Sequence, residues 1–162
     1  MAFHKPKMYL DPSVFIYYFS GDEDKRRMRD ITRRFFENEA PGQRYELVSS
    51  ELVLRALGNG FSSSNVEFAK SLPVIYLPVS DEVRRLAQKL VVEGLIPKSN
   101  PEIPLHLAFA LFHRVKYIVS WDFQHMIKPK TKKAVKIKSL QEGEMEIKII
   151  TPEAVVISGD DV

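Results

Sequence analysis

Carboxylates follow short apolar runs at several points in the chain, a pattern that could bind a metal ion. Three acids stand in this position: Asp11 after residues 8–10, Glu51 after residues 45–48 and two serines, and Asp122 after residues 117–119 and two further residues. The carboxyl ends of parallel strands meet at one sheet edge, so these acids are expected to share a crevice. Clustered carboxylates repel one another unless a hard cation such as Mg²⁺ or Mn²⁺ binds them. Such a metal activates water and stabilises the leaving oxygen in phosphodiester hydrolysis.

Lysines gather shortly after Asp122. The stretch 128–138 contains no acid and six lysines: Lys128, Lys130, Lys132, Lys133, Lys136 and Lys138. It is either a solvated loop or a basic rim of the same crevice, and both alternatives stay open. In the second alternative, the first four lysines contact phosphate. The formal net charge of +3 is compatible with a nucleic-acid partner but is weak support by itself.

Strands and helices are expected to alternate along the chain, and they must position these residues. Expected strands are 8–10, 45–48, 74–77, 117–119 and 147–150, and expected helices are 22–39, 51–58, 64–71, 81–93, 101–112 and a short one from 151. Asp22, Ser49, Ser50 and Ser80 are the expected caps. No helix is assigned to 12–19 or to the lysine stretch. The alternation predicts an α/β fold with three layers and a mostly parallel sheet of four or five strands.

The composition indicates one globular domain, with 44% hydrophobic and 28% charged residues among 162. We expect this domain to span residues 1–157, followed by a frayed tail over 158–162. No apolar run approaches the roughly 20 residues that span a bilayer, and no secretory apolar region follows the first residues. The sequence has no cysteine, which excludes disulfides and thiolate metal sites. A cytoplasmic location is therefore expected, with no membrane partner.

Five segments, in order, resemble the PIN-domain family of metal-dependent nucleases, which includes many bacterial toxin ribonucleases. They are residues 10–15 (Leu-Asp-Pro-Ser-Val-Phe), 50–54 (Ser-Glu-Leu-Val-Leu), 105–110 (Leu-His-Leu-Ala-Phe-Ala), 120–126 (Ser-Trp-Asp-Phe-Gln-His-Met) and 150–153 (Ile-Thr-Pro-Glu). The resemblance covers nearly the whole chain. It implies a three-layer α/β/α fold, a Mg²⁺- or Mn²⁺-dependent endoribonuclease, RNA as substrate, an antitoxin or other protein partner, and a homodimer.

The family's set of acids is incomplete in this chain. Asp11 matches the first acid and Asp122 the last, a position where related sequences often carry Asn. The second and third acids are replaced by Ala56 and Ile103. Glu51 and Glu102 are the nearest substitutes, although Glu51 lies about 140° around a helix from position 56 and Glu102 about 100° from position 103. The resemblance therefore implies Asp11 and Asp122 as metal ligands, with Glu51 and Glu102 as candidate catalytic partners.

Several polar and aromatic residues of these segments have a functional and a structural interpretation. Ser13 and Ser50 are candidate substrate contacts, but a hydroxyl in a turn equally often bonds the local backbone. His106 stands in an apolar helix, which favours a hydrogen-bonded core histidine over a catalytic base. His125 is expected to orient the loop after Asp122. Trp121 is expected to be a packing anchor, with base stacking as the alternative.

Two functional hypotheses follow from these residues. In the first, the chain is a divalent-metal-dependent ribonuclease, as the resemblance implies. In the second, it is a degenerate PIN domain that binds RNA or a protein without cutting. Replacing two anionic ligands by Ala56 and Ile103 weakens the attraction for a divalent ion and favours the second hypothesis, whereas the resemblance favours the first.

Overall fold

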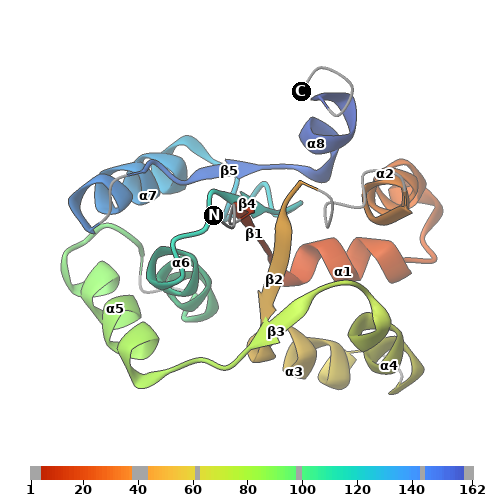
Figure 1. Ribbon diagram of the computed structural model, residues 1–162, viewed down its shortest axis with the longest axis horizontal. Helices are drawn as coiled ribbons and strands as arrows, with labels where there is room; N and C mark the ends of the chain where they lie inside the picture. The colour runs from red at the N-terminus through yellow and green to blue at the C-terminus, as the bar shows by residue number, and fades with distance from the viewer. Residues whose placement is uncertain (1–4, 38–43, 61–62, 98–99, 143–144, 159–162) are drawn as a thin grey trace.

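The computed structural model describes residues 5–37, 44–60, 63–97, 100–142 and 145–158 (Figure 1). The elements are β1 (Lys7–Leu10), α1 (Pro12–Phe19), the 3₁₀ turn η1 (Glu23–Lys25), α2 (Arg26–Glu37), β2 (Glu46–Ser50), α3 (Glu51–Gly60), α4 (Ser63–Ser71), β3 (Ile75–Leu77), α5 (Asp81–Val92), α6 (Glu102–Phe112), β4 (Tyr117–Val119), α7 (Pro129–Glu142), β5 (Lys148–Ile150) and α8 (Pro152–Ser158). The expected alternation of strand and helix is confirmed.

The five strands form one parallel sheet in the order β3-β2-β1-β4-β5. The chain proceeds from β1 outward to β2 and β3, and then returns to the other side of β1 as β4. In β1, Tyr9 lies opposite Val48 of β2 and Ile118 of β4. The reversal of strand order between β1 and β4 creates the crevice where open α/β sheets bind ligands.

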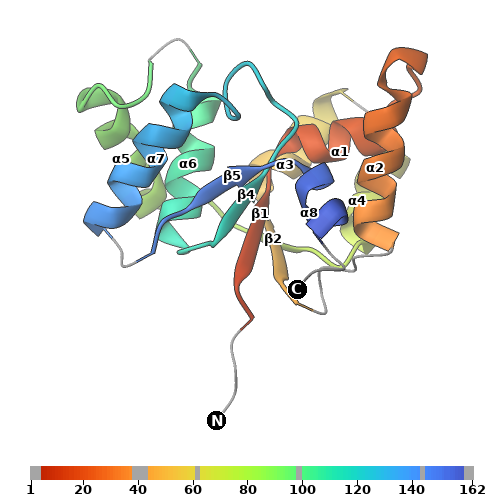
Figure 2. The ribbon, with the colours of Figure 1, turned by 90° about the horizontal axis from the view of Figure 1, so that it is seen from above.

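Helices cover both faces of the sheet, which confirms the predicted three-layer α/β/α fold. Helices α5, α6 and α7 lie on one face, and α1, α2, α3, α4 and α8 lie on the other (Figures 1 and 2). Each face of the sheet has its own hydrophobic core, and successive side chains of β1 alternate between them. Tyr9 packs in the core beneath α5, α6 and α7, whereas Met8 and Leu10 pack in the core on the other face. Burial on both faces explains why the strands are almost continuously apolar.

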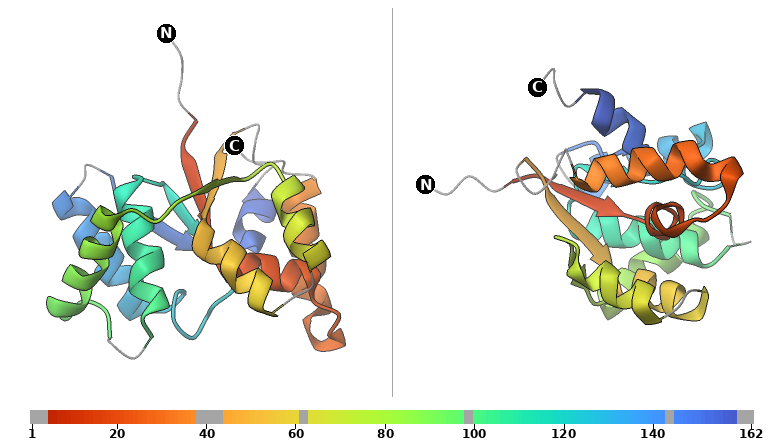
Figure 3. Two further views of the ribbon diagram at one scale, coloured as in Figure 1. Left: turned by 90° about the horizontal axis from the view of Figure 1, so that it is seen from below. Right: turned by 90° about the vertical axis from the view of Figure 1, so that its right-hand side faces the viewer.

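Helix α1 was not predicted, although its start carries a recognisable signal. Asp11 is its N-cap and accepts a hydrogen bond from the Ser13 N–H, while Pro12 occupies the first turn, where its missing N–H costs nothing. The helix packs between α2 and α3 and is seen end-on in the right panel of Figure 3. The residues 14–19 are aromatic or β-branched, a composition typical of strands, and this obscured the helix.

The interpretation of the lysine stretch as a loop was wrong, because residues 129–142 form α7. The inward residues recur at helical spacing and are Thr131, Ala134, Val135, Lys138 and Ser139. The ammonium of Lys138 is buried and lies 3.0 Å from the Glu93 carboxylate at the end of α5. The remaining lysines of the helix are exposed. The two faces of this helix differ little in polarity, because Lys138 is buried while Ile137 and Leu140 are exposed.

The predicted caps had different outcomes. Ser80 caps α5 through a 3.3 Å hydrogen bond from the Val83 N–H, as expected. Ser49 and Ser50 instead end β2, and the Ser49 hydroxyl donates across the sheet to the Leu10 carbonyl at 2.7 Å. They do not cap α3, because their hydroxyls are committed to β1. Asp22 is the residue before η1, but its side chain makes no capping hydrogen bond.

Two expectations concern the ends of elements and of the chain. Residues 38–39, the expected end of the helix from 22, and residues 159–162, most of the expected frayed tail, lie outside the described residues. Ser158 is the last residue of α8. Among the helices of the described ranges, none combines the length and apolar character required to cross a membrane.

A candidate binding pocket at the switch point

A cavity of about 530 Å³ opens where β1 and β4 end, at the switch point of the sheet. Its walls come from α1, the start of α6 and the loop after β4. The ionisable side chains that line it are Asp11, Lys25, Glu102, His106 and Asp122, and the large rings are those of Tyr17, Trp121 and Phe123. The structure thus brings together three of the four predicted acids, and it places them beside aromatic rings.

Asp11 is held by serine hydroxyls at the base of this pocket. Its Oδ1 accepts hydrogen bonds from the Ser13 N–H at 2.9 Å and from the Ser13 hydroxyl at 2.5 Å. Its Oδ2 accepts one from the Ser120 hydroxyl at 2.5 Å. Only 3% of the residue is exposed. The carboxylate therefore ties β1, α1 and the end of β4 together.

Burial raises the pKa of Asp11 to about 6, because desolvation of the charged form outweighs the hydrogen bonds from Ser120 and Ser13. The nearby Asp122 carboxylate raises this pKa further by charge repulsion. A carboxyl with this pKa changes its protonation state just below neutral pH. The switch point therefore contains a titratable group that is buried and held by hydrogen bonds from its neighbours.

Asp122 organises the loop that follows β4. Its Oδ1 accepts a hydrogen bond from the His125 N–H at 3.0 Å, and its Oδ2 lies 3.2 Å from His125 Nδ1. The Asp122 N–H donates to the Ser120 hydroxyl oxygen at 2.9 Å. Thr131, in the first turn of α7, donates to the His125 carbonyl at 2.6 Å. The geometry matches the expectation that His125 orients this loop.

A line of buried polar groups runs from β2 into the pocket. The Tyr9 hydroxyl lies 3.1 Å from the Ser50 hydroxyl and 2.5 Å from His106 Nδ1. Burial lowers the pKa of His106 to about 4, so its ring is neutral at neutral pH, and burial raises the pKa of Tyr9. His106 is thus the hydrogen-bonded, buried histidine that the sequence favoured. Ser50 is fully buried against Tyr9 and does not line the pocket.

Of the two glutamates considered as substitutes, Glu102 lines the pocket and Glu51 does not. Glu51 Oε1 accepts a hydrogen bond from the Val79 N–H at 3.2 Å and lies 3.1 Å from an Arg55 guanidinium nitrogen. Its carboxylate thereby ties α3 to the segment before α5. Ile103 lines the pocket. Ala56 is exposed on α3 and does not line the pocket.

Sequence reasoning missed the side chains at the mouth of the pocket. The Phe123 ring is 51% exposed and lies 6.3 Å, centroid to centroid, from Trp121. Trp121 is the predicted packing anchor: it is buried, and its Nε1–H donates to the Thr32 hydroxyl at 2.7 Å. Tyr17 also packs against Trp121, with ring centroids 6.0 Å apart, and the Lys25 ammonium lies 5.4 Å from the Tyr17 ring centroid. Recognising α1 would have placed Tyr17 one turn after Ser13.

The predicted phosphate-binding lysines do not line the pocket. Lys130, Lys132 and Lys133 are exposed along α7, and Lys128 precedes that helix. Lys25 is instead the basic side chain at the rim. The lysines of α7 therefore remain a candidate surface for distant phosphates of a longer ligand.

The residues of the pocket do not fit the catalytic metal that the resemblance implies. Mg²⁺ and Mn²⁺ require several oxygen ligands. Both carboxylate oxygens of Asp11 are engaged by serine hydroxyls, and the position of the third acid presents the hydrocarbon side chain of Ile103. Within the described ranges, no group of three or more His, Asp or Glu side chains could hold an ion.

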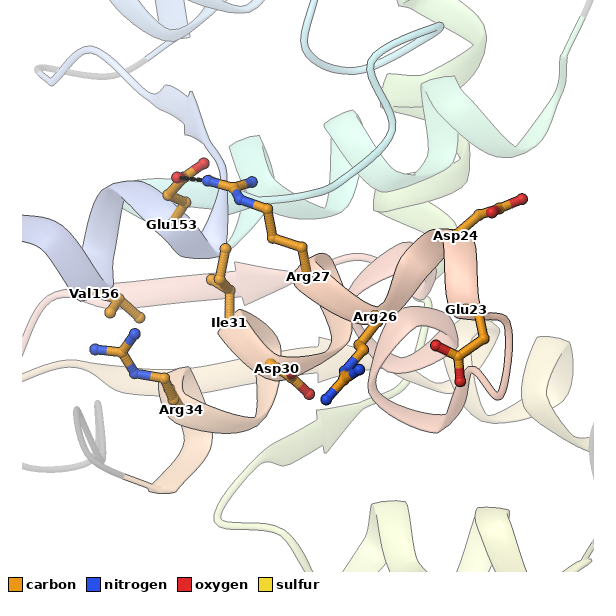
Figure 4. A pocket seen from close by; sticks show the side chains of 9 residues that line it. All are labelled: Glu23, Asp24, Arg26, Arg27, Asp30, Ile31, Arg34, Glu153 and Val156. Carbon is orange, nitrogen blue, oxygen red and sulfur yellow. Dashed lines mark hydrogen bonds and ion pairs between the residues drawn. The ribbon is translucent and has the colours of Figure 1, made fainter.

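Two further hollows lie elsewhere on the molecule. One, of about 680 Å³, lies between η1, α2 and α8, where the Arg27 side chain pairs with Glu153 (Figure 4). Its rim carries both signs of charge, from Arg26, Arg34, Asp30 and others. The second, between α5 and α6, is largely apolar and includes the exposed Val92. Neither contains the buried, hydrogen-bonded ionisable groups found at the switch point.

Comparison with known proteins supports the fold. A chain in a structure described as a toxin-antitoxin complex from Klebsiella pneumoniae superposes with a TM-score of 0.51 at 15% identity, over 76% of this chain and 94% of that one. At this identity the similarity concerns the fold alone. No protein-family model matches the sequence, and comparison with curated proteins finds no match.

Proposed function

We propose that this chain is a PIN-like domain that binds single-stranded RNA at the switch-point pocket without metal-dependent hydrolysis. One observation carries the proposal. The pocket retains Asp11 and Asp122 of the family's acids, but serine hydroxyls engage Asp11 and Ile103 stands where a third ligand is expected. These features support a polar pocket that lacks an oxygen ligand at the position where the resemblance implies the third acid of a nuclease centre.

RNA is supported as the ligand by the pocket's chemistry together with the sequence resemblance. Phe123 presents a half-exposed aromatic ring, on which an unpaired base can stack. Lys25 provides a positive charge at the rim, and the exposed lysines of α7 extend the basic surface. Exposed aromatic rings combined with basic residues are typical of proteins that bind single strands.

A metal-dependent ribonuclease is the second candidate function. It is favoured by the observation that Asp11, Glu102 and Asp122 line one cavity. A protein partner of the antitoxin kind is a further proposal, supported by the similarity in fold to a chain of a toxin-antitoxin complex. The homodimer and the cytoplasmic location implied by the sequence also stay predictions.

An RNA cleavage assay separates the first two functions. We expect a fluorescent single-stranded RNA to stay intact with the chain in millimolar Mn²⁺ or Mg²⁺. Cleavage that needs the metal and is lost in Asp11→Asn would establish the nuclease instead. The variant Ile103→Asp adds a carboxylate to the lining of the pocket, at the position of the family's third acid. Calorimetry should therefore detect Mn²⁺ binding to this variant that is tighter than to the original chain.

A further inference from the structure

The pocket wall presents a hydrogen-bond donor next to an acceptor. His106 is 97% buried and lines the cavity, and because Tyr9 occupies its Nδ1, Nε2 is the ring nitrogen left for a ligand. Within the described part of the chain, Nε2 makes no hydrogen bond, and the Glu102 carboxylate lies 3.9 Å from it. Such a nitrogen at the wall of a cavity is available to a ligand.

The surrounding charges place the proton of the neutral His106 ring on Nε2. The Tyr9 phenol, 2.5 Å from Nδ1, keeps its proton because burial raises its pKa, and it can donate that proton to Nδ1. The other tautomer would direct the Nε2 lone pair at the Glu102 carboxylate, which is unfavourable. His106 therefore offers an N–H to the pocket, and Glu102 beside it offers two acceptor oxygens.

Phe123 forms a supported platform at the mouth of the same pocket. Its ring packs against Trp121, and the hydrogen bond to Thr32 fixes the Trp121 indole. The Phe123 N–H donates to the Trp121 carbonyl at 3.0 Å, which holds the turn between the two residues. Phe123, His106 and Glu102 line the same cavity, so a planar ligand stacked on Phe123 would lie in the pocket that holds the other two side chains.

The charge of the pocket decides which part of a nucleotide can enter. Asp11, Glu102 and Asp122 would repel a phosphate inside the cavity. Lys25, at the rim, can instead attract the phosphate backbone outside it. A nucleic-acid strand would therefore insert a base and leave its phosphates at the surface.

We infer that the pocket selects guanine in single-stranded RNA, an inference that rests on the proposed function. Guanine presents an acceptor oxygen beside two adjacent N–H donors on its Watson–Crick edge. His106 Nε2–H would donate to that oxygen, and the Glu102 carboxylate would accept from both donors. Uracil has a single N–H between two acceptors and would direct a carbonyl oxygen at an acidic wall. Adenine and cytosine fall between these two.

Fluorescence anisotropy with matched RNAs tests this selection. The probes are oligouridine strands of one length that carry a single central guanine, adenine, cytosine or uracil. We expect the guanine strand to bind at least about tenfold more tightly than the uracil strand, the discrimination typical of one bidentate base contact. The backbone charge is equal in all strands, so the ratio of affinities reports base reading alone.

Two variants with matched controls assign the selection to the pocket. Glu102→Ala should abolish the preference for guanine, whereas Glu82→Ala, in the first turn of α5 and equally exposed, should keep it. Phe123→Ala should lower the affinity for the guanine strand roughly tenfold, because the stacking contact is lost. Phe112→Ala removes an aromatic ring of similar exposure at the far end of α6 and should have no effect.

The outcomes distinguish a failure of guanine selection from a failure of RNA binding. Equal binding of the four strands, or a preference for uracil, would overturn the selection of guanine while RNA binding stands. Retention of the preference in Glu102→Ala would overturn the assignment to this pocket. If no strand binds, or if only a basic peptide occupies the pocket, the proposed function itself fails.

Discussion

The switch-point pocket and the pocket between α2 and α8 both contain acidic and basic residues, but these residues differ in their exposure to solvent. In the first, Asp11 is 3% exposed and accepts three hydrogen bonds from Ser13 and Ser120. In the second, Arg27 and Glu153 form an ion pair whose side chains are 68% and 32% exposed. The second cavity is the larger, at about 680 Å³ against 530 Å³. Size and number of charges therefore do not identify the functional pocket.

Burial distinguishes the two pockets because it makes each polar contact costly to lose. An exposed ion pair exchanges protein contacts for water at little cost. A buried carboxylate with serine donors leaves those donors unsatisfied if it is removed. Asp11 therefore keeps its contacts with Ser13 and Ser120, whereas Arg27 and Glu153 can exchange their ion pair for contacts with water. Three measurements test this contrast.

The largest effect is expected for Asp11→Ala. The substitution removes a buried carboxylate and leaves the Ser13 and Ser120 donors without their acceptor, which should cost about 3 kcal/mol of unfolding free energy. Urea denaturation measures this loss. Asp30→Ala, which removes an exposed carboxylate on α2, is the control and should change stability by less than about 0.5 kcal/mol. Equal losses in the two variants would remove the contrast between the pockets.

A pH series on Asp11→Asn gives an effect of intermediate size. The pKa of Asp11 is raised to about 6 in the folded chain from its ordinary value of 3.8, so the folded state binds this proton more tightly. Its stabilising contribution is complete below about pH 3.8 and is lost as pH rises through 6. Over the whole titration a pKa change of this size corresponds to ~3 kcal/mol, of which about 2 kcal/mol falls between pH 4 and 6.

His106 titrates in the opposite sense, so the variant is needed to isolate Asp11. The pKa of His106 is lowered to about 4 by burial, and this stabilises the fold as pH rises from about 4 to 6.5. Both chains contain His106, so the difference in their unfolding free energies isolates Asp11. The advantage of the original chain over Asp11→Asn should shrink as pH rises from 4 to 6. An advantage that grows with pH would contradict the raised pKa of Asp11.

The smallest effect is expected for Arg27→Ala in the pocket of Figure 4. The ion pair with Glu153 is exposed and screened by salt, so its loss should cost less than about 1 kcal/mol. A double-mutant cycle with Glu153→Ala measures the pair directly. A coupling energy as large as the loss in Asp11→Ala would show that exposure does not separate the two pockets.

The sequence was sufficient to predict the architecture, because strand and helix periodicity is local. Apolar runs such as 8–10 and 117–119 lie in β1 and β4, and the Asp11 and Asp122 that follow them share the crevice. The parallel order of the strands follows from the helical connections between them. The aromatic composition of α1 and the many lysines of α7 obscured two helices whose faces are defined by tertiary packing.

The contents of the pocket were less predictable, because they depend on contacts between distant segments. The Ser120 hydroxyl reaches Asp11 across 109 positions of the chain, and Tyr9 meets His106 across 97. In the sequence, Glu51 and Glu102 were both candidate substitutes, although at different angular offsets from the expected positions. The structure separates them because the Val79 N–H and Arg55 engage Glu51, whereas Glu102 begins a helix that lines the crevice.

One binding titration tests whether the switch-point pocket binds RNA without a metal ion. The affinity of the chain for a guanine-containing single-stranded RNA is measured in EDTA and again in millimolar Mn²⁺, with the RNA recovered and sized afterwards. We predict equal affinity in the two buffers and intact RNA. Binding that requires Mn²⁺, or RNA shortened in its presence, would contradict the claim.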